Sequence, residues 1–253
     1  MSEGIWSAWY DLESGAEEAY LAWLHDTYIP WLKQLPGIAW IAHYRSTGGG
    51  AAMQRLHETA SYPDEPMPTG GNFILLVGAP SVHVFWNPYV FEIPMPEGFA
   101  EMLALRRETR MEFYVEEARV DGASGCNRLN GSTPAPAIQF GTYRMRSVEA
   151  EFFLGQFNTQ SRFPTMAQMP GSVRVRKMVS VAGWPKHGVL YEFNSLEAQL
   201  QHEEKLEYQT LVADTWTGRN TANAIYAPGS PFVGERIWPP ISAQDETRGA
   251  ITQ

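Results

Sequence analysis

His25 and Tyr28 stand one helical turn apart in a segment whose leucines recur every three to four residues, the spacing of one helix face. A histidine can give or take a proton near pH 7, because its ordinary pKa is about 6.5. A tyrosine, with an ordinary pKa of about 10, is a poor base but a good hydrogen-bond donor. The pair therefore predicts proton-transfer chemistry, with His25 as acid or base and Tyr28 as donor.

His25 also fits a second interpretation. It borders the apolar stripe of its helix, so a structural histidine that is hydrogen-bonded in the interior is as good a hypothesis as a catalytic one. The neighbouring Asp26 points about 100° around the helix, which places it in solvent rather than beside His25. Both interpretations put His25 against a sheet.

Two arginines are the candidates for holding an anion. Arg174 and Arg176 alternate with valines along a predicted strand, so they share one face of it. In an apolar cavity they could hold a carboxylate or an enolate through forked hydrogen bonds. The alternative is a structural network in which they pair with Glu192 or other acids. The sequence leaves both hypotheses open.

The elements that must position these residues occur twice. The chain matches itself at an offset of 134 residues, and this length indicates a duplicated domain rather than a short repeat. The second copy carries Thr159 and Arg162 in place of His25 and Tyr28, so one active site, in the first copy, is expected. The matching positions are residues 6–10 and 140–144, Trp23 and Phe157, Pro30 and Pro164, and Pro36-Gly37 and Pro170-Gly171.

Each copy predicts the order strand, helix, strand, strand, helix, strand. This is the ferredoxin-like plan of the α+β class, an antiparallel sheet with both helices on one face. In the first copy a capping box, Ser14 with Glu17, opens the first helix, which Pro36-Gly37 ends. The other elements are predicted at 5–11, 38–45, 73–78, 98–110 (helix) and 112–120. Those of the second copy are predicted at 138–146, 148–169 (helix), 173–182, 188–193, 195–215 (helix) and 222–227.

The copies define the domains: residues 1–120, a linker at 121–137, and residues 138–227. Two such sheets facing each other would pair into one α+β barrel with an interior cavity. The first copy has long insertions at 46–72 and 80–97, which are expected to fold over one mouth of the barrel. The tail, 228–253, is expected to strap across the body and to fray at its polar end.

The cavity face follows from comparing the copies. At the offset of 134, Trp40 and Tyr44 fall on the arginine face and are expected to line the cavity. Trp9 and Tyr10 point to opposite faces of their strand, so one of them must reach the cavity, and both are candidate ligand contacts. His43 falls on the valine face, away from the cavity, which counts against a catalytic role. A pocket of aromatic rings favours an aromatic or conjugated ligand.

Composition limits the class of protein. The net charge of −9 disfavours nucleic-acid binding, which needs a basic face. No apolar run reaches the length of a membrane span, and the start of the chain lacks a basic signal-peptide region, so the expected location is the cytoplasm. The single Cys126 and the scattered histidines predict no metal site, and no cofactor is expected.

The segment from Trp23 to Tyr44 carries a motif. It consists of Tyr28-x-Pro30-x-Leu32, then Leu35-Pro36-Gly37, then an apolar strand that ends in His43-Tyr44. This run resembles the EthD-like branch of the dimeric α+β barrel superfamily, whose members include cofactor-free monooxygenases, cyclases, dehydratases, isomerases and haem enzymes. The EthD-like pattern usually has histidine where this chain has Tyr28, which favours His25, one turn earlier, as the base.

These observations together predict a cofactor-independent enzyme of lyase, dehydratase, cyclase or isomerase type acting on an aromatic or polyketide-like compound. One alternative is a cofactor-free or haem-dependent oxidoreductase on the same fold. Another is a non-catalytic protein that only binds its ligand. A homodimer is possible, assembled through outer surfaces.

Overall fold

The computed structural model describes residues 3–125, 131–205, 214–242 and 245. Within them, eight antiparallel strands close into a barrel in the order β7-β6-β4-β1-β3-β2-β9-β5, and β5 pairs back with β7. A ninth strand, β8, extends the sheet from β5 outside the ring. The strands are β1 Gly4–Leu12, β2 Trp40–Ser46, β3 Phe73–Ala79, β4 Arg106–Asp121, β5 Ala137–Met145, β6 Ser172–Ala182, β7 His187–Phe193, β8 Ala224–Tyr226 and β9 Phe232–Trp238.

The two halves of the chain order their strands alike. The first gives β4-β1-β3-β2 and the second gives β8-β5-β7-β6, so each half has its fourth strand beside its first and its third between first and second. The halves join at β4–β6 on one side and through β9, between β2 and β5, on the other. The barrel is therefore closed by one chain.

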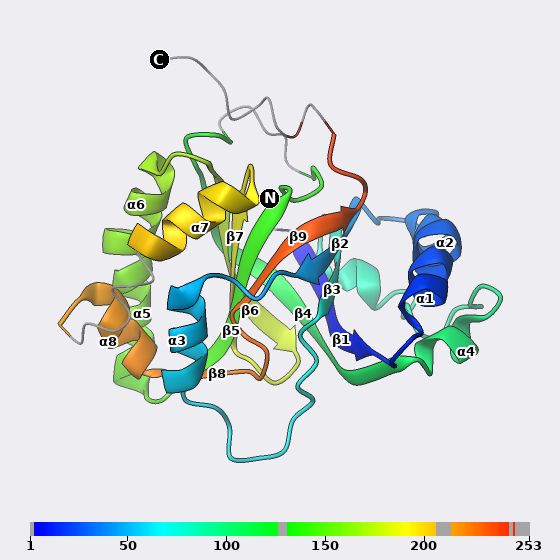
Figure 1. Cartoon of the computed structure of the whole chain (residues 1–253), viewed down its shortest axis with the longest axis horizontal. Coiled ribbons are helices and arrows are strands. Elements are labelled where there is room, and N and C mark those ends of the chain that lie inside the picture. Colours follow the sequence, from blue (N-terminus) through cyan, green and yellow to red (C-terminus); the bar gives the residue numbers. More distant parts are fainter. Residues whose placement is uncertain (1–2, 126–130, 206–213, 243–244, 246–253) are drawn as a thin grey trace.

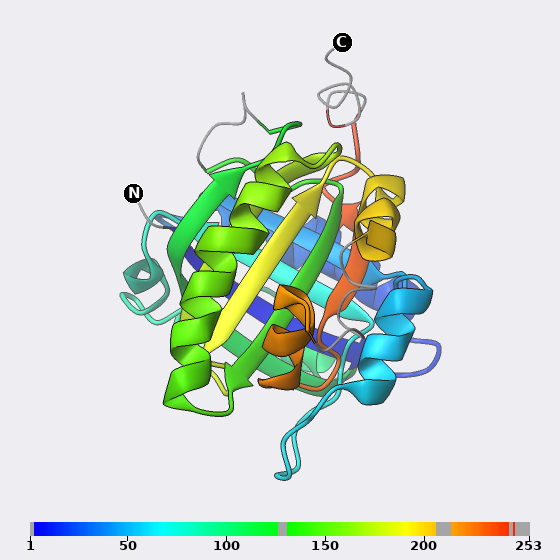
Figure 2. The same cartoon turned by 90° about the vertical axis from the view of Figure 1, so that its left-hand side faces the viewer.

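The helices cover the outside of the barrel in two groups. Figure 1 shows α1, α2 and α4 at one end of the long axis and α5 to α8 at the other, with α3 from the first half among the second group. In Figure 2, α5 and α6 run along the outer face of the second sheet. The helices are α1 Glu17–Trp23, α2 Ile29–Lys33, α3 Ala51–Thr59, α4 Phe99–Leu103, α5 Val148–Phe157, α6 Phe163–Gln168, α7 Leu196–Lys205 and α8 Trp216–Ala222.

A π-helical turn interrupts the first long helix of each half. The turns are Leu24–Tyr28, between α1 and α2, and Asn158–Arg162, between α5 and α6, and they lie 134 residues apart. Pro30 and Pro164 follow them. A proline has no N–H to donate and its ring crowds the carbonyl four residues back, so the helix widens there. Such turns often mark functional sites, and the first of these contains His25 and Tyr28.

Apolar side chains fill the inside of the barrel. Trp9, Trp40, Tyr44 and Phe140 are between 0 and 3 % exposed and form one cluster there with aliphatic side chains of both halves. The side chains of β2 and β6 that point into the barrel are therefore the ones that the comparison of the two copies predicted. The expected open cavity is not found among these side chains, because rings of this size pack against one another across the barrel.

The second helix of the first half is much shorter than predicted. Instead of a helix at 98–110, α4 ends at Leu103 and β4 begins at Arg106, where it pairs with Leu12 of β1. The pattern of residues 106–110 fits either element, and pairing with β1 decides for a strand. The predicted capping box is also wrong: the helix N-cap is Ala16, and no side chain caps it.

The long insertions cover outer faces. In the segment 80–97, Phe85 and Phe91 pack edge-on against Trp6, in the cluster between the helices and the first sheet. In the segment 46–72, α3 places Met53 and Leu56 against Val233 on the outside of β9. These side chains pack on the outside of the sheet, so the prediction that they would cover a mouth of the barrel is wrong.

The C-terminal region also differs from the prediction. Residues 232–238 are not a surface strap but β9, a strand of the barrel, because the edges of β2 and β5 would otherwise lie apart with unpaired backbone groups. The predicted helix at 195–215 is α7 as far as Lys205, and residues 206–213 lie outside the described residues. The end of the tail, where fraying was predicted, also lies outside the described residues.

Candidate active site between the first helix and the sheet

Three side chains from three elements form a hydrogen-bonded chain. His25 Nε2, on the π-turn, lies 2.9 Å from His43 Nδ1 on β2. His43 Nε2 lies 2.8 Å from the hydroxyl of Tyr10 on β1. The chain lies on the outer, helix-covered face of the first sheet. The sequence predicted His43 on this face but did not predict its contact with His25.

Burial increases along the chain. His25 is half-buried, while His43 and Tyr10 are 0 % exposed. Desolvation by burial, with Asp26 acting in the opposite direction, lowers the pKa of His25. Desolvation together with the charges of His25, Arg106 and Arg45 lowers the pKa of His43 well below its usual value. Both imidazoles are therefore neutral at pH 7, and His25 can act as a base.

Two proton arrangements satisfy both hydrogen bonds. In one, His25 Nε2–H donates to His43 Nδ1 and His43 Nε2–H donates to Tyr10, so Nδ1 of His25 is left as a base. In the other, Tyr10 donates to His43 and His43 donates to His25, so His25 Nδ1–H can donate a hydrogen bond to a substrate. His43 resists protonation because it is fully buried, so a proton taken up stays on His25. His43 and Tyr10 orient the His25 ring and set its tautomer.

Arg106 and Tyr20 hold the inner end of this chain. The Arg106 guanidinium lies 4.1 Å from the Tyr10 ring centre and its Nε donates to the hydroxyl of Tyr20 at 2.5 Å. Desolvation, opposed in part by Arg106, raises the pKa of Tyr10 well above its usual value, so Tyr10 remains a neutral hydroxyl. Sequence reasoning missed both residues. Tyr20 lies on the apolar face of the helix, and Arg106 fell within the predicted helix at 98–110.

Tyr28 is packed rather than open. Its ring stacks on Trp23 at 5.3 Å and on Trp31 at 5.6 Å, and it is 3 % exposed. Desolvation by burial raises the pKa of its hydroxyl well above the usual value. Tyr28 is therefore neutral and can only donate or accept a hydrogen bond. The π-turn places His25 and Tyr28 in one turn, but His25 forms its hydrogen bond with His43.

The remaining aromatic candidates divide between the two sides of the sheet. Trp9, Trp40 and Tyr44 lie inside the barrel, where the Trp9 indole donates to Ser7 Oγ at 3.2 Å and the Tyr44 hydroxyl donates to the carbonyl of Ala135 at 2.7 Å. Tyr10 lies outside and belongs to the His43 chain. Of the residues predicted to contact a ligand, only Tyr10 is connected to His25, through His43.

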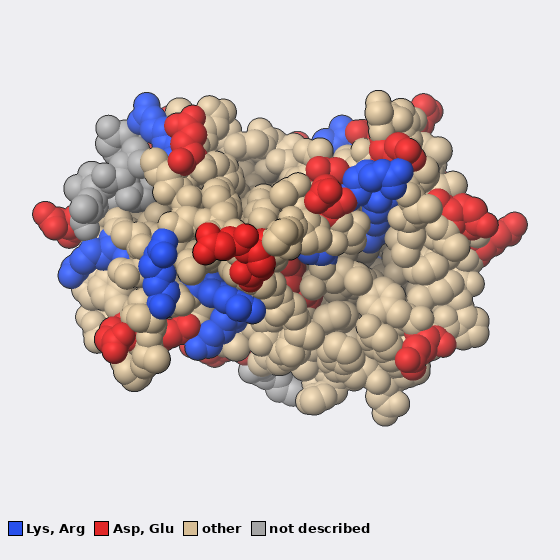
Figure 3. Space-filling view, turned by 90° about the horizontal axis from the view of Figure 1, so that it is seen from below, with Lys and Arg blue, Asp and Glu red and all other residues tan. Residues whose placement is uncertain are grey.

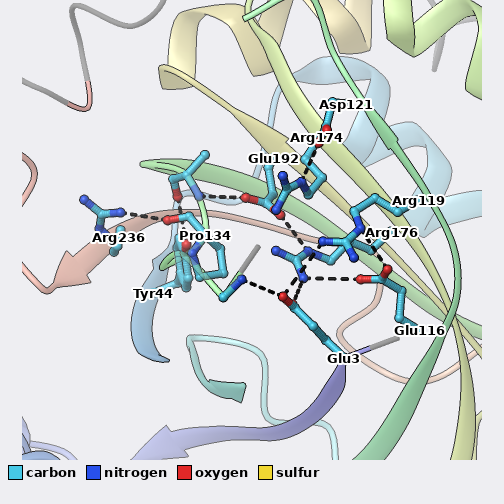
Figure 4. A network of polar contacts seen from close by, with 12 residues as sticks. Glu3, Tyr44, Glu116, Arg119, Asp121, Pro134, Arg174, Arg176, Glu192 and Arg236 are labelled. Atoms are coloured by element: carbon cyan, nitrogen blue, oxygen red, sulfur yellow. Dashed lines mark hydrogen bonds and ion pairs between the residues drawn. The ribbon is translucent and has the colours of Figure 1, made fainter. Parts of the chain in front are cut away.

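Arg174 and Arg176 lie inside the barrel and are engaged by acids, as Figure 4 shows. Arg176 donates to Glu192 at 2.9 Å and also pairs with Glu116 and Glu3. Arg174 donates to Asp121 at 2.6 Å. Both arginines are 0 % exposed. These contacts correspond to the structural network that was the alternative hypothesis for the pair.

The charged surface carries no patch of one sign on the face seen in Figure 3. Acidic and basic side chains lie next to each other there. Among the described helices, none has the length and apolar composition to cross a lipid bilayer.

The fold is shared with several solved structures, although no protein family and no characterised protein matches the sequence. A candidate monooxygenase from Lactobacillus acidophilus is 9 % identical with a TM-score of 0.55, covering 93 % of this chain and 94 % of its own. A candidate chlorite dismutase is 10 % identical with a TM-score of 0.53, and each chain is covered completely. An anthrone oxidase-like protein is 10 % identical with a TM-score of 0.53, covering 93 % of this chain and 91 % of its own.

These likenesses define the class of fold. The chain shares the closed α+β barrel fold of these structures. At such low identity they do not extend to activity.

Haem was a sequence-based alternative, and the histidines test whether it would fit. His43 and His187 have hydrogen-bond partners on both ring nitrogens, and the His202 ring packs on Phe193 at 5.2 Å. His57 contacts the hydroxyl of Tyr62. His43 and His187 therefore do not fit an axial ligand, which must turn a free ring nitrogen towards an open space for the macrocycle. The described residues also contain no cluster of three metal-ligating side chains.

Proposed function

We propose that the chain is a small-molecule enzyme in which His25 transfers a proton to or from its substrate. The observation that supports this most is the chain from His25 through His43 to Tyr10. It links a half-exposed imidazole to two buried groups that fix its tautomer, and such an orienting partner is typical of catalytic histidines. Lyase, dehydratase, cyclase and isomerase reactions all begin or end with a proton transfer of this kind.

The substrate class follows from what one imidazole can do. Among carbon and oxygen acids, a neutral histidine most readily removes a proton from those whose conjugate base is delocalised, such as phenols and β-dicarbonyl compounds. Aromatic or polyketide-like molecules meet this condition. The indoles and phenols around the first helix, Trp23 and Trp31 among them, suit flat molecules of this type.

The experiment measures proton transfer directly. The protein is incubated in D₂O with a panel of phenolic and β-dicarbonyl compounds, and deuterium incorporation at the acidic carbon is followed by NMR. We expect catalysed exchange of at least one compound by the wild type and its loss in His25→Ala. If no compound exchanges faster with protein than without it, the proposal of proton transfer fails.

An oxidoreductase is the second candidate function. It is favoured by the descriptions of structural neighbours as a candidate monooxygenase and as anthrone oxidase-like. Oxygen uptake, recorded with the same panel, distinguishes it from non-oxidative chemistry. A visible absorption spectrum of the purified protein tests the haem-dependent form, and binding without turnover would indicate a ligand carrier.

We further propose that the chain is a tandem duplication of one ferredoxin-like unit and belongs to the EthD-like branch. The equal strand orders of the two halves and the two π-turns at an offset of 134 support the duplication. The domains would be 1–120 and 138–227, joined by 121–137. A cytoplasmic location and a homodimer remain predictions.

A further inference from the structure

Arg106 carries a positive charge that no acidic side chain of the described structure neutralises. Three buried arginines illustrate the usual arrangement, because each pairs with a carboxylate. The pairs are Arg110–Glu112, Arg176–Glu192 and Arg236–Asp245. No described carboxylate forms an ion pair with Arg106, whose hydrogen bond goes to a phenol instead. Its counter-charge is therefore supplied from outside these residues, by solvent or by a ligand.

Two phenol rings hold the Arg106 guanidinium in place. Its central carbon lies 4.1 Å from the centre of the Tyr10 ring and 5.5 Å from that of the Tyr20 ring. A ring face attracts a cation less strongly than a carboxylate does, and phenols carry no charge at neutral pH. Burial raises the pKa of the Tyr10 hydroxyl still further. The rings thus orient the guanidinium but leave its charge unbalanced.

Most of the donors of Arg106 lack an acceptor. Nε donates to the Tyr20 hydroxyl at 2.5 Å. Nη2 is buried and has no hydrogen-bond partner in the described part of the chain, and no described residue accepts a hydrogen bond from Nη1. Buried donors are almost always paired in native proteins, because leaving one desolvated is unfavourable. The two Nη groups form the end of a planar fork, which matches the two oxygens of a carboxylate in geometry and charge.

The surroundings of Arg106 are partly open and apolar. The residue itself is partly exposed, at the start of β4. Leu12 lies opposite it on β1, and Leu105 precedes it in the chain; both leucines are partly buried and pack against the core of the first half. A molecule that approaches Arg106 from solvent therefore meets leucine side chains as well as N–H groups. Such surroundings suit a carboxylate with an apolar body.

We propose that Arg106 binds the carboxylate of an apolar or aromatic acid. The two Nη groups donate to the carboxylate oxygens, while Leu12 and Leu105 contact the body of the molecule. The proposal goes beyond proton transfer by His25. Binding is measured without turnover, so it holds or fails whether or not His25 is catalytic.

The test uses benzoate as the probe and two controls: benzamide, which has nearly the same shape without the charge, and acetate, which has the charge without the ring. Binding to the full-length protein is measured by titration calorimetry and by the shift in Tm at constant ionic strength. We expect saturable binding of benzoate and roughly tenfold weaker binding of each control. No saturable binding of benzoate, or a control that binds as tightly, overturns the proposal.

Two variants of neighbouring residues assign the binding to Arg106. Arg106→Met removes the fork and keeps an apolar stem, and we expect it to abolish benzoate binding. Arg107→Met is the matched control, because it removes the same charge one residue further along, where Arg107 is exposed and pairs with Glu13 at 2.9 Å. It should bind benzoate like the wild type. Equal losses in the two variants would reveal a general effect of charge and overturn the assignment.

Arg106→Lys decides the case if Arg106→Met does not fold. Lysine keeps the charge and an apolar stem but replaces the planar fork with a point charge, so benzoate should bind roughly tenfold more weakly than to the wild type. Wild-type affinity in Arg106→Lys, or in a folded Arg106→Met, shows that benzoate binds elsewhere and overturns the proposal.

Discussion

His25 and His43 share a hydrogen bond of 2.9 Å although one belongs to a helix and the other to the sheet beneath it. The two rings meet edge to face, with their centres 5.2 Å apart. The bond connects a half-buried imidazole to one that solvent does not reach. The outer face of the first sheet, rather than the inside of the barrel, is therefore where titratable groups and access to solvent coincide.

His25→Ala should lower kcat by roughly 10²- to 10⁴-fold, the usual contribution of a positioned acid or base. Its Tm should change little, because His25 is half-buried and water can take its place beside His43. Steady-state kinetics and thermal unfolding measure the two effects. A large fall in Tm, with activity lost only in step with the folded fraction, would assign His25 a structural role.

Tyr28→Phe should leave kcat within a few-fold of the wild type, because it keeps the ring that stacks on Trp23 and Trp31. The variant is a matched control for His25→Ala on the same π-turn. The measurement is kcat with the same substrate. A loss comparable to that of His25→Ala would instead support the hydrogen-bond donor role that the sequence predicts for Tyr28.

The buried His43 should make the protein less stable in acid. Its pKa in the folded state lies well below the unfolded value of about 6.5, so the unfolded chain binds more protons between these two values. Its contribution to stability is complete above pH 6.5 or so and is lost as the pH falls towards the folded pKa. Denaturant unfolding at several pH values between about 7.5 and 5 measures this loss.

The control for this effect is His43→Phe, which keeps a ring between Tyr10 and Phe73. Its unfolding free energy should depend less steeply on pH than that of the wild type. A residual slope is expected, since burial and the nearby Lys177 lower the pKa of His187 to about 4. An unchanged slope in His43→Phe would show that His43 does not titrate as described.

Arg176→Met should destabilise the protein by about 3–5 kcal/mol, since it removes the guanidinium that pairs with the fully buried Glu192. For a chain of this size, this corresponds to a fall in Tm of roughly 6–20 °C. Arg174→Met is the comparison: its partner Asp121 is 45 % exposed and stays solvated, so the loss should be smaller. A raised KM with an unchanged Tm would instead favour an anion-binding role for Arg176.

Met53→Ala on α3 should lower the unfolding free energy by about 2–5 kcal/mol, because Met53 is 0 % exposed against β9. Trimming residues 48–66 removes the same contact, so it should reduce stability and not only affect ligand binding. Thermal unfolding measures both. A trimmed protein with wild-type Tm would show that α3 is a dispensable cover.

The sequence predicted which face of the sheet each side chain of β2 occupies, because side chains alternate along a strand and the two copies had to agree. Trp40 and Tyr44 were placed inside, and His43 outside, on that basis. The filling of the barrel could not be predicted in this way. Periodicity tells which side a ring faces but not whether the rings from opposite walls meet.

The contact between His25 and His43 was also beyond local patterns. It depends on how the π-turn lies over β2, which no spacing rule specifies. Arg106 was missed for a related reason, because its segment fits either a helix or a strand and only pairing with β1 decides. Both errors arise from interactions between segments distant in sequence.

The position of β9 has a consequence for how the protein is made. This strand is the last element of the barrel in the chain, yet it lies between β2 and β5 and pairs with both. While the ribosome is still synthesising residues 232–238, both neighbours present unpaired backbone edges, which are prone to associate with other chains. We therefore expect the ring to close only once β9 is available to pair, and truncation before Phe232 to yield a species that chaperones retain.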